Sequence, residues 1–129
     1  MTVPAGPGRA GSDLASTLLD RHDALLLDLD GVVYVGPQPV AHAVDALLAA
    51  VGSGVATAYV TNNAARPPEV VAEHLRSFGL PVDAHDVVTS AQAGAREVAA
   101  RVPAGSRVLA VGGPGVAAAG LFALWRLSV

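Results

Sequence analysis

The feature that most constrains the fold of this chain is an apolar run that ends in two closely spaced carboxylates. Residues 24–29 are Ala-Leu-Leu-Leu-Asp-Leu, and Asp30 and Gly31 follow directly. A short continuous apolar run is typical of a fully buried strand in a parallel sheet, whose carboxyl end is where open α/β sheets bind ligands. Asp28 and Asp30 stand at that end, where Gly31 allows a sharp turn. Two carboxylates this close repel unless a cation offsets their charge, and magnesium prefers oxygen ligands of this type.

Segments with strand patterns and helix patterns alternate along the rest of the chain. Hydrophobic periodicity and turn residues predict strands at residues 24–29, 55–60, 86–89 and 107–111. They predict helices at residues 14–21, 41–51, 67–78 and 91–102, and a last helix that begins after a Gly-Gly-Pro-Gly turn and ends near residue 125. Ser90 is a good N-cap for the helix at residues 91–102. The alternation implies right-handed crossovers and an α/β fold, a mostly parallel sheet with flanking helices.

Composition excludes several classes of function. The net charge of −3 over 129 residues gives no reason to expect a nucleic-acid partner. Cysteine is absent, which excludes disulfides, thiolate catalysis and cysteine zinc sites. The uncharged residues 108–125 are nearly long enough to span a membrane, but the Gly-Gly-Pro-Gly in their middle favours a strand, a turn and a helix. The N-terminus has no basic segment followed by an apolar run, so we expect a cytoplasmic protein without a membrane partner.

A second polar cluster, Thr61-Asn62-Asn63, follows the strand predicted at residues 55–60. The carboxyl ends of parallel strands lie on the same side of a sheet, so Thr61 can face Asp28 if the two strands are neighbours. A hydroxyl donor and main-chain amides beside two acids and a metal would suit a phosphoryl group. The alternative is that Thr61 and Asn62 only form a turn and that Asp28 is a solvated loop residue.

Two segments carry a family resemblance. Residues 28–34, Asp-Leu-Asp-Gly-Val-Val-Tyr, and residues 59–66, Tyr-Val-Thr-Asn-Asn-Ala-Ala-Arg, resemble the first and second signatures of the haloacid dehalogenase (HAD) superfamily. The match is closer to its NagD-like branch, which includes p-nitrophenylphosphatase-type and glycerol-3-phosphate phosphatases. The resemblance implies a Rossmannoid core that is incomplete at the C-terminus. We therefore expect the chain to consist of three parts: a flexible leader at residues 1–13, the N-terminal part of the core at residues 14–104, and the start of a truncated cap domain at residues 105–129.

The resemblance also implies a role for each matching residue in a magnesium-dependent phosphatase. Asp28 would be the nucleophile that forms an aspartyl-phosphate, and Asp30 would be the general acid and then the general base. Both would hold Mg²⁺, Asp28 through its carboxylate and Asp30 through its main-chain carbonyl. The phosphate of a small phosphorylated metabolite would be bound by Gly31, Thr61, Asn62 and Asn63.

The chain departs from the family pattern in its charged residues. HAD enzymes have a third signature with a lysine and a fourth with an acidic pair, whereas this chain has no lysine and no acidic residue after Glu97. We therefore expect the N-terminal part of a longer phosphatase, with weak metal binding and little turnover by itself. The resemblance leaves the substrate open, as well as whether the full-length form is a homo-oligomer.

Two other functions are compatible with the sequence. One is a truncated, non-enzymatic paralogue that binds phosphate or a partner. The other is a Rossmann-type nucleotide-binding module, because Gly113-Pro114-Gly115-Val116-Ala117-Ala118 fits the pattern G-x-G-x-x-A. For this second alternative, however, the following strand with its ribose-binding acid is missing from the sequence.

Overall fold

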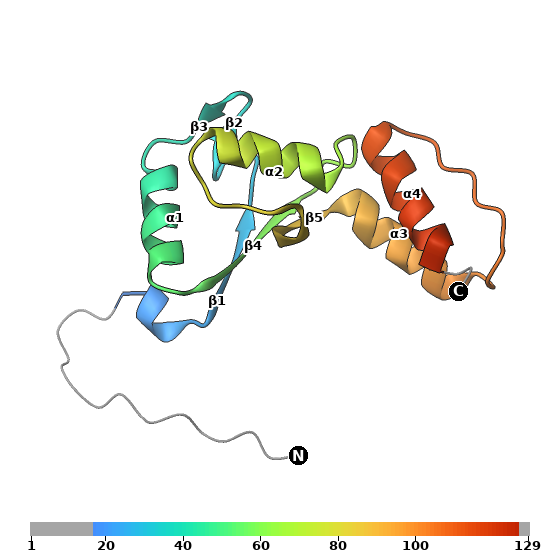
Figure 1. The fold of residues 1–129 in the computed structure, drawn as a ribbon, viewed down its shortest axis with the longest axis horizontal. Coiled ribbons are helices and arrows are strands. Elements are labelled where there is room, and N and C mark those ends of the chain that lie inside the picture. Colours follow the sequence, from blue (N-terminus) through green and yellow to red (C-terminus); the bar gives the residue numbers. More distant parts are fainter. Residues whose placement is uncertain (1–16, 127–129) are drawn as a thin grey trace, which may run out of the picture.

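The computed structural model describes residues 17–126, which form two lobes (Figure 1). The leader predicted at residues 1–13 lies outside the described residues. The elements are, in chain order, η1 (Leu19–Arg21), β1 (Ala24–Asp28), β2 (Tyr34–Val35), β3 (Gln38–Pro39), α1 (Ala43–Gly52), β4 (Ala56–Thr61), α2 (Pro68–Ser77), η2 (Ala84–Asp86), β5 (Val87–Thr89), α3 (Ser90–Arg101) and α4 (Pro114–Arg126). We call residues 19–89 the sheet lobe and residues 90–126 the helical lobe. The α/β fold class predicted from the sequence is confirmed.

A parallel three-stranded sheet in the order β1-β4-β5 is the centre of the sheet lobe. Leu27 is in register with Tyr59, and Tyr59 with Val87, so these side chains share one face of the sheet. On that face lies the core, to which α1 and α2 contribute buried side chains. The core cluster comprises Leu29, Val33, Tyr34, Leu47, Tyr59, Val71, Ala72, Leu75, Leu80, Val82 and Val87.

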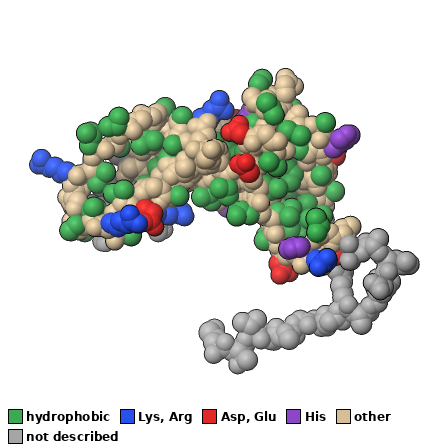
Figure 2. Space-filling model, turned by 180° about the vertical axis from the view of Figure 1, so that it is seen from behind, with side chains coloured by type: hydrophobic (Ala, Val, Ile, Leu, Met, Phe, Trp, Pro, Cys, Tyr) green, Lys and Arg blue, Asp and Glu red, His purple; other side chains and the backbone are tan. Residues whose placement is uncertain are grey.

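The opposite face of the sheet is open, which corrects the prediction of a fully buried first strand. Exposure alternates along β1, and Leu26 is 76% exposed. Strand residues alternate between the two faces, and α1 and α2 bury only one of them. The apolar run of residues 24–29 predicted the strand correctly, but burial on its second face requires a covering element that the described residues do not supply. Hydrophobic side chains are visible on the surface of both lobes in Figure 2.

The prediction of a strand at residues 107–111 is wrong. This segment forms no strand and pairs with none within residues 17–126. It runs beside α3 and α4 in the helical lobe (Figure 1), where Leu109 is 88% and Val111 81% exposed. A β-strand needs a neighbour for its main-chain N–H and C=O groups, and the sheet ends at β5 in the other lobe. The alternation of strands and helices therefore stops at α3.

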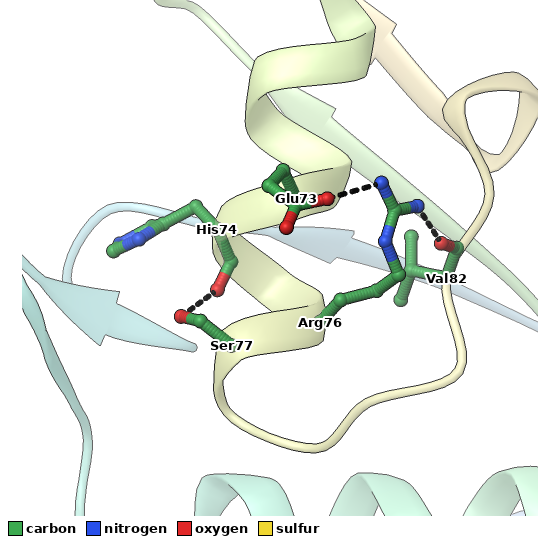
Figure 3. Close-up of polar contacts among 5 residues, drawn as sticks. All are labelled: Glu73, His74, Arg76, Ser77 and Val82. Carbon is green, nitrogen blue, oxygen red and sulfur yellow. Dashed lines mark hydrogen bonds and ion pairs between the residues drawn. The ribbon is translucent and has the colours of Figure 1, made fainter.

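Contacts of α2 hold the sheet lobe together. The rings of Tyr34 and His74 lie edge to face with centroids 4.8 Å apart, and His74 Nε2 lies 3.2 Å from the Gly36 carbonyl oxygen. These contacts attach the β2–β3 hairpin to the helix. Arg76 donates to the Val82 carbonyl at 2.7 Å and forms an ion pair with Glu73 at 2.7 Å (Figure 3). The segment between α2 and β5 is thereby fixed to α2.

One local prediction needs correction. The helix predicted at residues 14–21 is, over its described part, only the 3-10 helix η1, and the Asp20 carboxylate accepts from the main-chain N–H of Thr17 at 2.8 Å. Along α2, Val71, Ala72 and Leu75 are buried, whereas Val70 is 48% exposed. None of the described helices is both long and apolar enough to cross a membrane.

Candidate active site

The carboxyl ends of the three parallel strands form one edge of the sheet. β1 ends at Asp28, β4 at Thr61 and β5 at Thr89. β1 and β4 are neighbours, as the phosphate-site prediction required. Asp28 is in register with Val60, and Thr61 with Thr89. The two polar clusters found in the sequence are therefore brought together at this edge.

A tight turn after β1 presents the two carboxylates. The Leu29 carbonyl accepts from the main-chain N–H groups of Val33 at 2.9 Å and Tyr34 at 3.2 Å. Gly31 has φ +83°, a conformation that other residues adopt only with strain, and its N–H donates to the Tyr34 carbonyl at 2.8 Å. The sharp turn predicted at Gly31 is thus present, and this amide is used inside the protein.

Asp28 and Asp30 are both exposed, and neither forms a salt bridge within the described part of the chain. The Asp28 Oδ1 atom accepts a hydrogen bond from the Leu29 N–H at 2.9 Å. This contact orients the carboxylate and leaves Oδ2 for a ligand. The Asp28 carboxylate and the Asp30 main-chain carbonyl offer oxygen ligands that suit part of the coordination shell of Mg²⁺, a hard cation that keeps several water ligands when few protein oxygens bind it.

Thr61 differs in placement from the expectation that it faces Asp28. Because Asp28 pairs with Val60, Thr61 is one residue further along, on the sheet face that carries Tyr59. Its side chain is 2% exposed, and its Oγ1 atom accepts from the Asn63 N–H at 3.1 Å. Among the described residues, the hydroxyl proton of Thr61 has no hydrogen-bond acceptor.

The loop formed by residues 61–66, which follows β4, is fixed by contacts from within and from the helical lobe. The Asn63 side chain accepts from the Ala65 N–H at 2.8 Å. The Ser90 hydroxyl donates to the Asn62 carbonyl at 2.8 Å, and the Gly115 N–H donates to the Ala65 carbonyl at 2.9 Å. Sequence reasoning missed both contacts from the helical lobe, because nothing local marks a contact between such distant residues.

The sequence predicted Ser90 as the N-cap of the third helix, but in the structure Ser90 is the first residue of α3. Thr89 is the cap: its hydroxyl oxygen accepts from the Gln92 N–H at 3.2 Å, and the Gln92 side chain accepts from the Thr89 N–H at 2.9 Å. This reciprocal arrangement is a capping box, for which Gln92 is correctly placed three residues later. The Ser90 hydroxyl is consequently left to contact the loop.

Tyr34 and Arg66 lie beside the site, and sequence reasoning predicted no role for either residue. Burial raises the pKa of the Tyr34 phenol, the carboxylates of Asp30 and Asp28 raise it further, and the Arg66 guanidinium opposes them. Arg66 is therefore a cation within electrostatic reach of this edge. Its position at the end of the second signature segment is the signal that could have suggested it.

A second group of metal-type ligands lies on η2. The ligand atoms of Asp83, His85 and Asp86 lie within 4.8 Å of one another. The Asp86 carboxylate already accepts from the Asp83 N–H at 2.9 Å, as part of the capping box of η2. Because η2 leads into β5, this group is at the amino end of the strand, away from Asp28.

The nucleotide-binding alternative lacks the structure that its fingerprint requires. Within the described residues, no strand leads directly into Gly113, since residues 107–111 pair with no strand. The Gly115 amide that would face a pyrophosphate donates to Ala65 instead. The glycines serve a packing role against the loop of residues 61–66.

Comparison with known proteins places these features in a family. The family model described as haloacid dehalogenase-like hydrolase matches residues 25–120. A D-glycerol 3-phosphate phosphatase of Mycobacterium tuberculosis is 43% identical over 96 residues, which cover 74% of this chain and 26% of that protein. An acid sugar phosphatase of Staphylococcus saprophyticus is 36% identical over 98 residues, covering 76% and 38%.

Solved structures that resemble this chain are also phosphatases. The glycerol phosphate phosphatase of Mycobacterium tuberculosis, solved in complex with magnesium, superposes with a TM-score of 0.75 at 40% identity, over 84% of this chain and 32% of that one. A p-nitrophenyl phosphatase from Archaeoglobus fulgidus gives 0.68 at 28% identity, over 78% and 38%. The chain thus spans between 26% and 38% of the length of these relatives.

Proposed function

Because this chain belongs to the haloacid dehalogenase-like hydrolase family, we propose that it carries the nucleophile and the phosphate-binding loop of a phosphatase for small phosphorylated metabolites. The observation that carries the proposal is the meeting of Asp28, Asp30 and residues 61–63 at one edge of the parallel sheet. The names of the relatives, a glycerol 3-phosphate phosphatase and an acid sugar phosphatase, support a polyol or sugar phosphomonoester as the substrate class.

Asp28 is the proposed nucleophile. Its Oδ1 atom is held by the Leu29 N–H, so Oδ2 attacks phosphorus, the ester oxygen leaves, and an aspartyl-phosphate forms. Water then attacks the aspartyl-phosphate and releases inorganic phosphate. Asp30 gives a proton to the leaving oxygen and takes one from the attacking water. The exposure of both carboxylates supports these roles, because substrate and water can reach them.

Phosphate binding is assigned to the Thr61 hydroxyl and the main-chain amide of Asn62, beside the turn at Gly31. The contribution of Gly31 is the turn itself, since its N–H is bonded to Tyr34. Asn63 supports the site by holding Thr61 and Ala65 in place. Mg²⁺ would be held by the Asp28 carboxylate and the Asp30 carbonyl, and when bound it offsets the negative charge that phosphate and carboxylate bring together.

Turnover by this chain alone is expected to be low. It contains no lysine to balance the charge of the phosphoryl group and no acidic residue after Glu97 to add to the metal ligands. The cap boundary at residues 104 and 105 stays a prediction, and α3 packs mainly on α4 in the helical lobe. Self-association of a longer form also stays a prediction.

The test is the binding of inorganic phosphate with and without Mg²⁺, measured by calorimetry. We expect binding by the wild-type chain that requires Mg²⁺. Asp28→Asn should abolish this Mg²⁺-dependent binding, whereas Asp45→Asn, which neutralises an exposed acid on α1, should leave it unchanged. Equal binding by the Asp28→Asn and wild-type chains would contradict the proposal. Hydrolysis of p-nitrophenyl phosphate in the same samples separates catalysis from the non-enzymatic alternative.

A further inference from the structure

The phosphate-binding loop has few stabilising contacts of its own. Asn62, Asn63, Ala65 and Arg66 are exposed. The internal hydrogen bonds that the structure gives this loop are short-range, from Asn63 to Thr61 and from Ala65 to Asn63. Exposed loops with so few contacts open easily. A defined position of the Asn62 amide therefore needs contacts from elsewhere in the molecule.

Two residues of the helical lobe supply such contacts, one at the start of each helix. Ser90, the first residue of α3, donates its hydroxyl proton to the Asn62 carbonyl at 2.8 Å. Gly115, the second residue of α4, donates its main-chain N–H to the Ala65 carbonyl at 2.9 Å. The two bonds reach the loop at different points, so together they fix both its position and its direction.

The contact between Gly115 and the loop of residues 61–66 depends on the absence of a side chain at position 115. Gly115 is buried, and a Cβ atom at this position would overlap the Ala64 carbonyl oxygen and lie 2.8 Å from the carbonyl carbon and oxygen of Arg66. Even the milder position Gly113 would bring a Cβ to 3.1 Å from the Ala65 oxygen. Main chain thus rests directly on main chain, which only glycine permits.

We propose that Ser90 and Gly115 are positioning residues that hold residues 61–66 in the conformation that binds phosphate. The inference rests on the proposed function, because it assigns these two residues a part in the same site. Its consequence is that the helical lobe and the phosphate-binding loop move as a unit. A shift of α4 relative to the sheet displaces the loop and with it the Asn62 amide.

The loop can be tested without any ligand, by amide hydrogen exchange at Asn63 and Ala65 in the complete 129-residue chain. Loss of one hydrogen bond by Ser90→Ala should speed exchange at these amides about five- to tenfold. Ser90→Thr keeps a hydroxyl and should restore the wild-type rates. Gly115→Ala should speed exchange at the same amides. Gly94→Ala, in the middle of α3 with open space around its Cβ, is the control and should change nothing.

Inorganic phosphate in the presence of Mg²⁺ is then the probe for function. Ser90→Ala should weaken its binding and Ser90→Thr should not. Wild-type exchange rates in Ser90→Ala, or failure of threonine to restore them, would overturn the inference, and this pair decides the matter if Gly115→Ala does not fold. If the wild-type chain binds no phosphate, the proposed function fails, while the exchange rates still decide whether Ser90 and Gly115 hold the loop.

Discussion

Replacement of Thr61 by valine would separate its part in phosphate binding from its part in folding. Valine has nearly the same shape as threonine, so the packing around this side chain, which is 2% exposed, is kept. The hydroxyl is lost, and with it the acceptor for the Asn63 N–H at 3.1 Å. Thr57→Val in the same strand is the matched control, because the hydrogen bond that the Thr57 hydroxyl makes among the described residues goes to the Val55 carbonyl, at 3.3 Å, away from the site edge.

The two expected effects differ in size. One neutral hydrogen bond contributes about 1 kcal/mol, and water can replace it at the exposed Asn63, so unfolding in urea should show a loss of at most about 1 kcal/mol. A hydrogen bond to a charged phosphate contributes about 1.5–3 kcal/mol, so phosphate affinity should fall by about tenfold to a hundredfold. Thr57→Val should change neither the free energy of unfolding nor the phosphate affinity appreciably.

Calorimetric titration of inorganic phosphate in the presence of Mg²⁺, beside urea unfolding of the same samples, measures both quantities. A Thr61→Val chain that binds phosphate as tightly as the wild type would refute the assignment of the hydroxyl as a phosphate donor. A loss of affinity matched by Thr57→Val would show that the effect comes from the strand as a whole.

Three further outcomes follow from the structure. Leu75→Ala empties a fully buried core position and should lower the free energy of unfolding by about 2–5 kcal/mol in urea, and an effect under 1 kcal/mol would contradict the core described here. Gly31→Ala should lower the free energy of unfolding in urea by about 1–2 kcal/mol, because φ at Gly31 is +83°. Gly52 is helical and has open space around it, so Gly52→Ala should not lower the free energy of unfolding. Burial raises the pKa of both tyrosines, Tyr34 and Tyr59, with carboxylates adding to it, so phenolate absorbance should appear above pH 10 in the folded chain and near pH 10 in urea. Since a raised pKa favours the folded state only while the phenol is protonated, stability should decline as pH rises from about 10 through the folded-state pKa values; ordinary tyrosine titration in the folded chain would refute this.

The sequence predicted the elements whose signals are local. The apolar run before Asp28 is strand β1, the prolines at 67 and 68 stand at the start of α2, and Gly79, with φ +89°, ends the turn after it. The convergence of two polar clusters also followed from the sequence, because parallel strands must place their carboxyl ends together. For these features, the pattern of a few neighbouring residues was sufficient.

Properties that depend on distant partners were not predictable in this way. The apolar residues around Leu26 predicted strand β1 correctly. They could not predict that the Leu26 side chain is 76% exposed, because its burial depends on whether another element covers that face of the sheet. The segment of residues 107–111 has a strand's composition but no neighbour with which to pair. Ser90 and Thr89 are both good caps, and Gln92 decides between them. The contact of Gly115 with Ala65 joins segments that no local pattern connects.

The ring contacts of the β2–β3 hairpin limit how the segment that follows Asp30 and Gly31 can move. Tyr34 lies between the turn that carries Asp30 and the C-terminal part of α2, with ring centroids 4.8 Å from His74 on the helix and 6.2 Å from Phe78, which directly follows it. A hairpin that is packed against a helix in this way does not undergo the nanosecond motions of a free loop. We therefore expect the order parameters of the hairpin in solution to match those of α2, because the ring contacts and the His74 contact with Gly36 join the two elements.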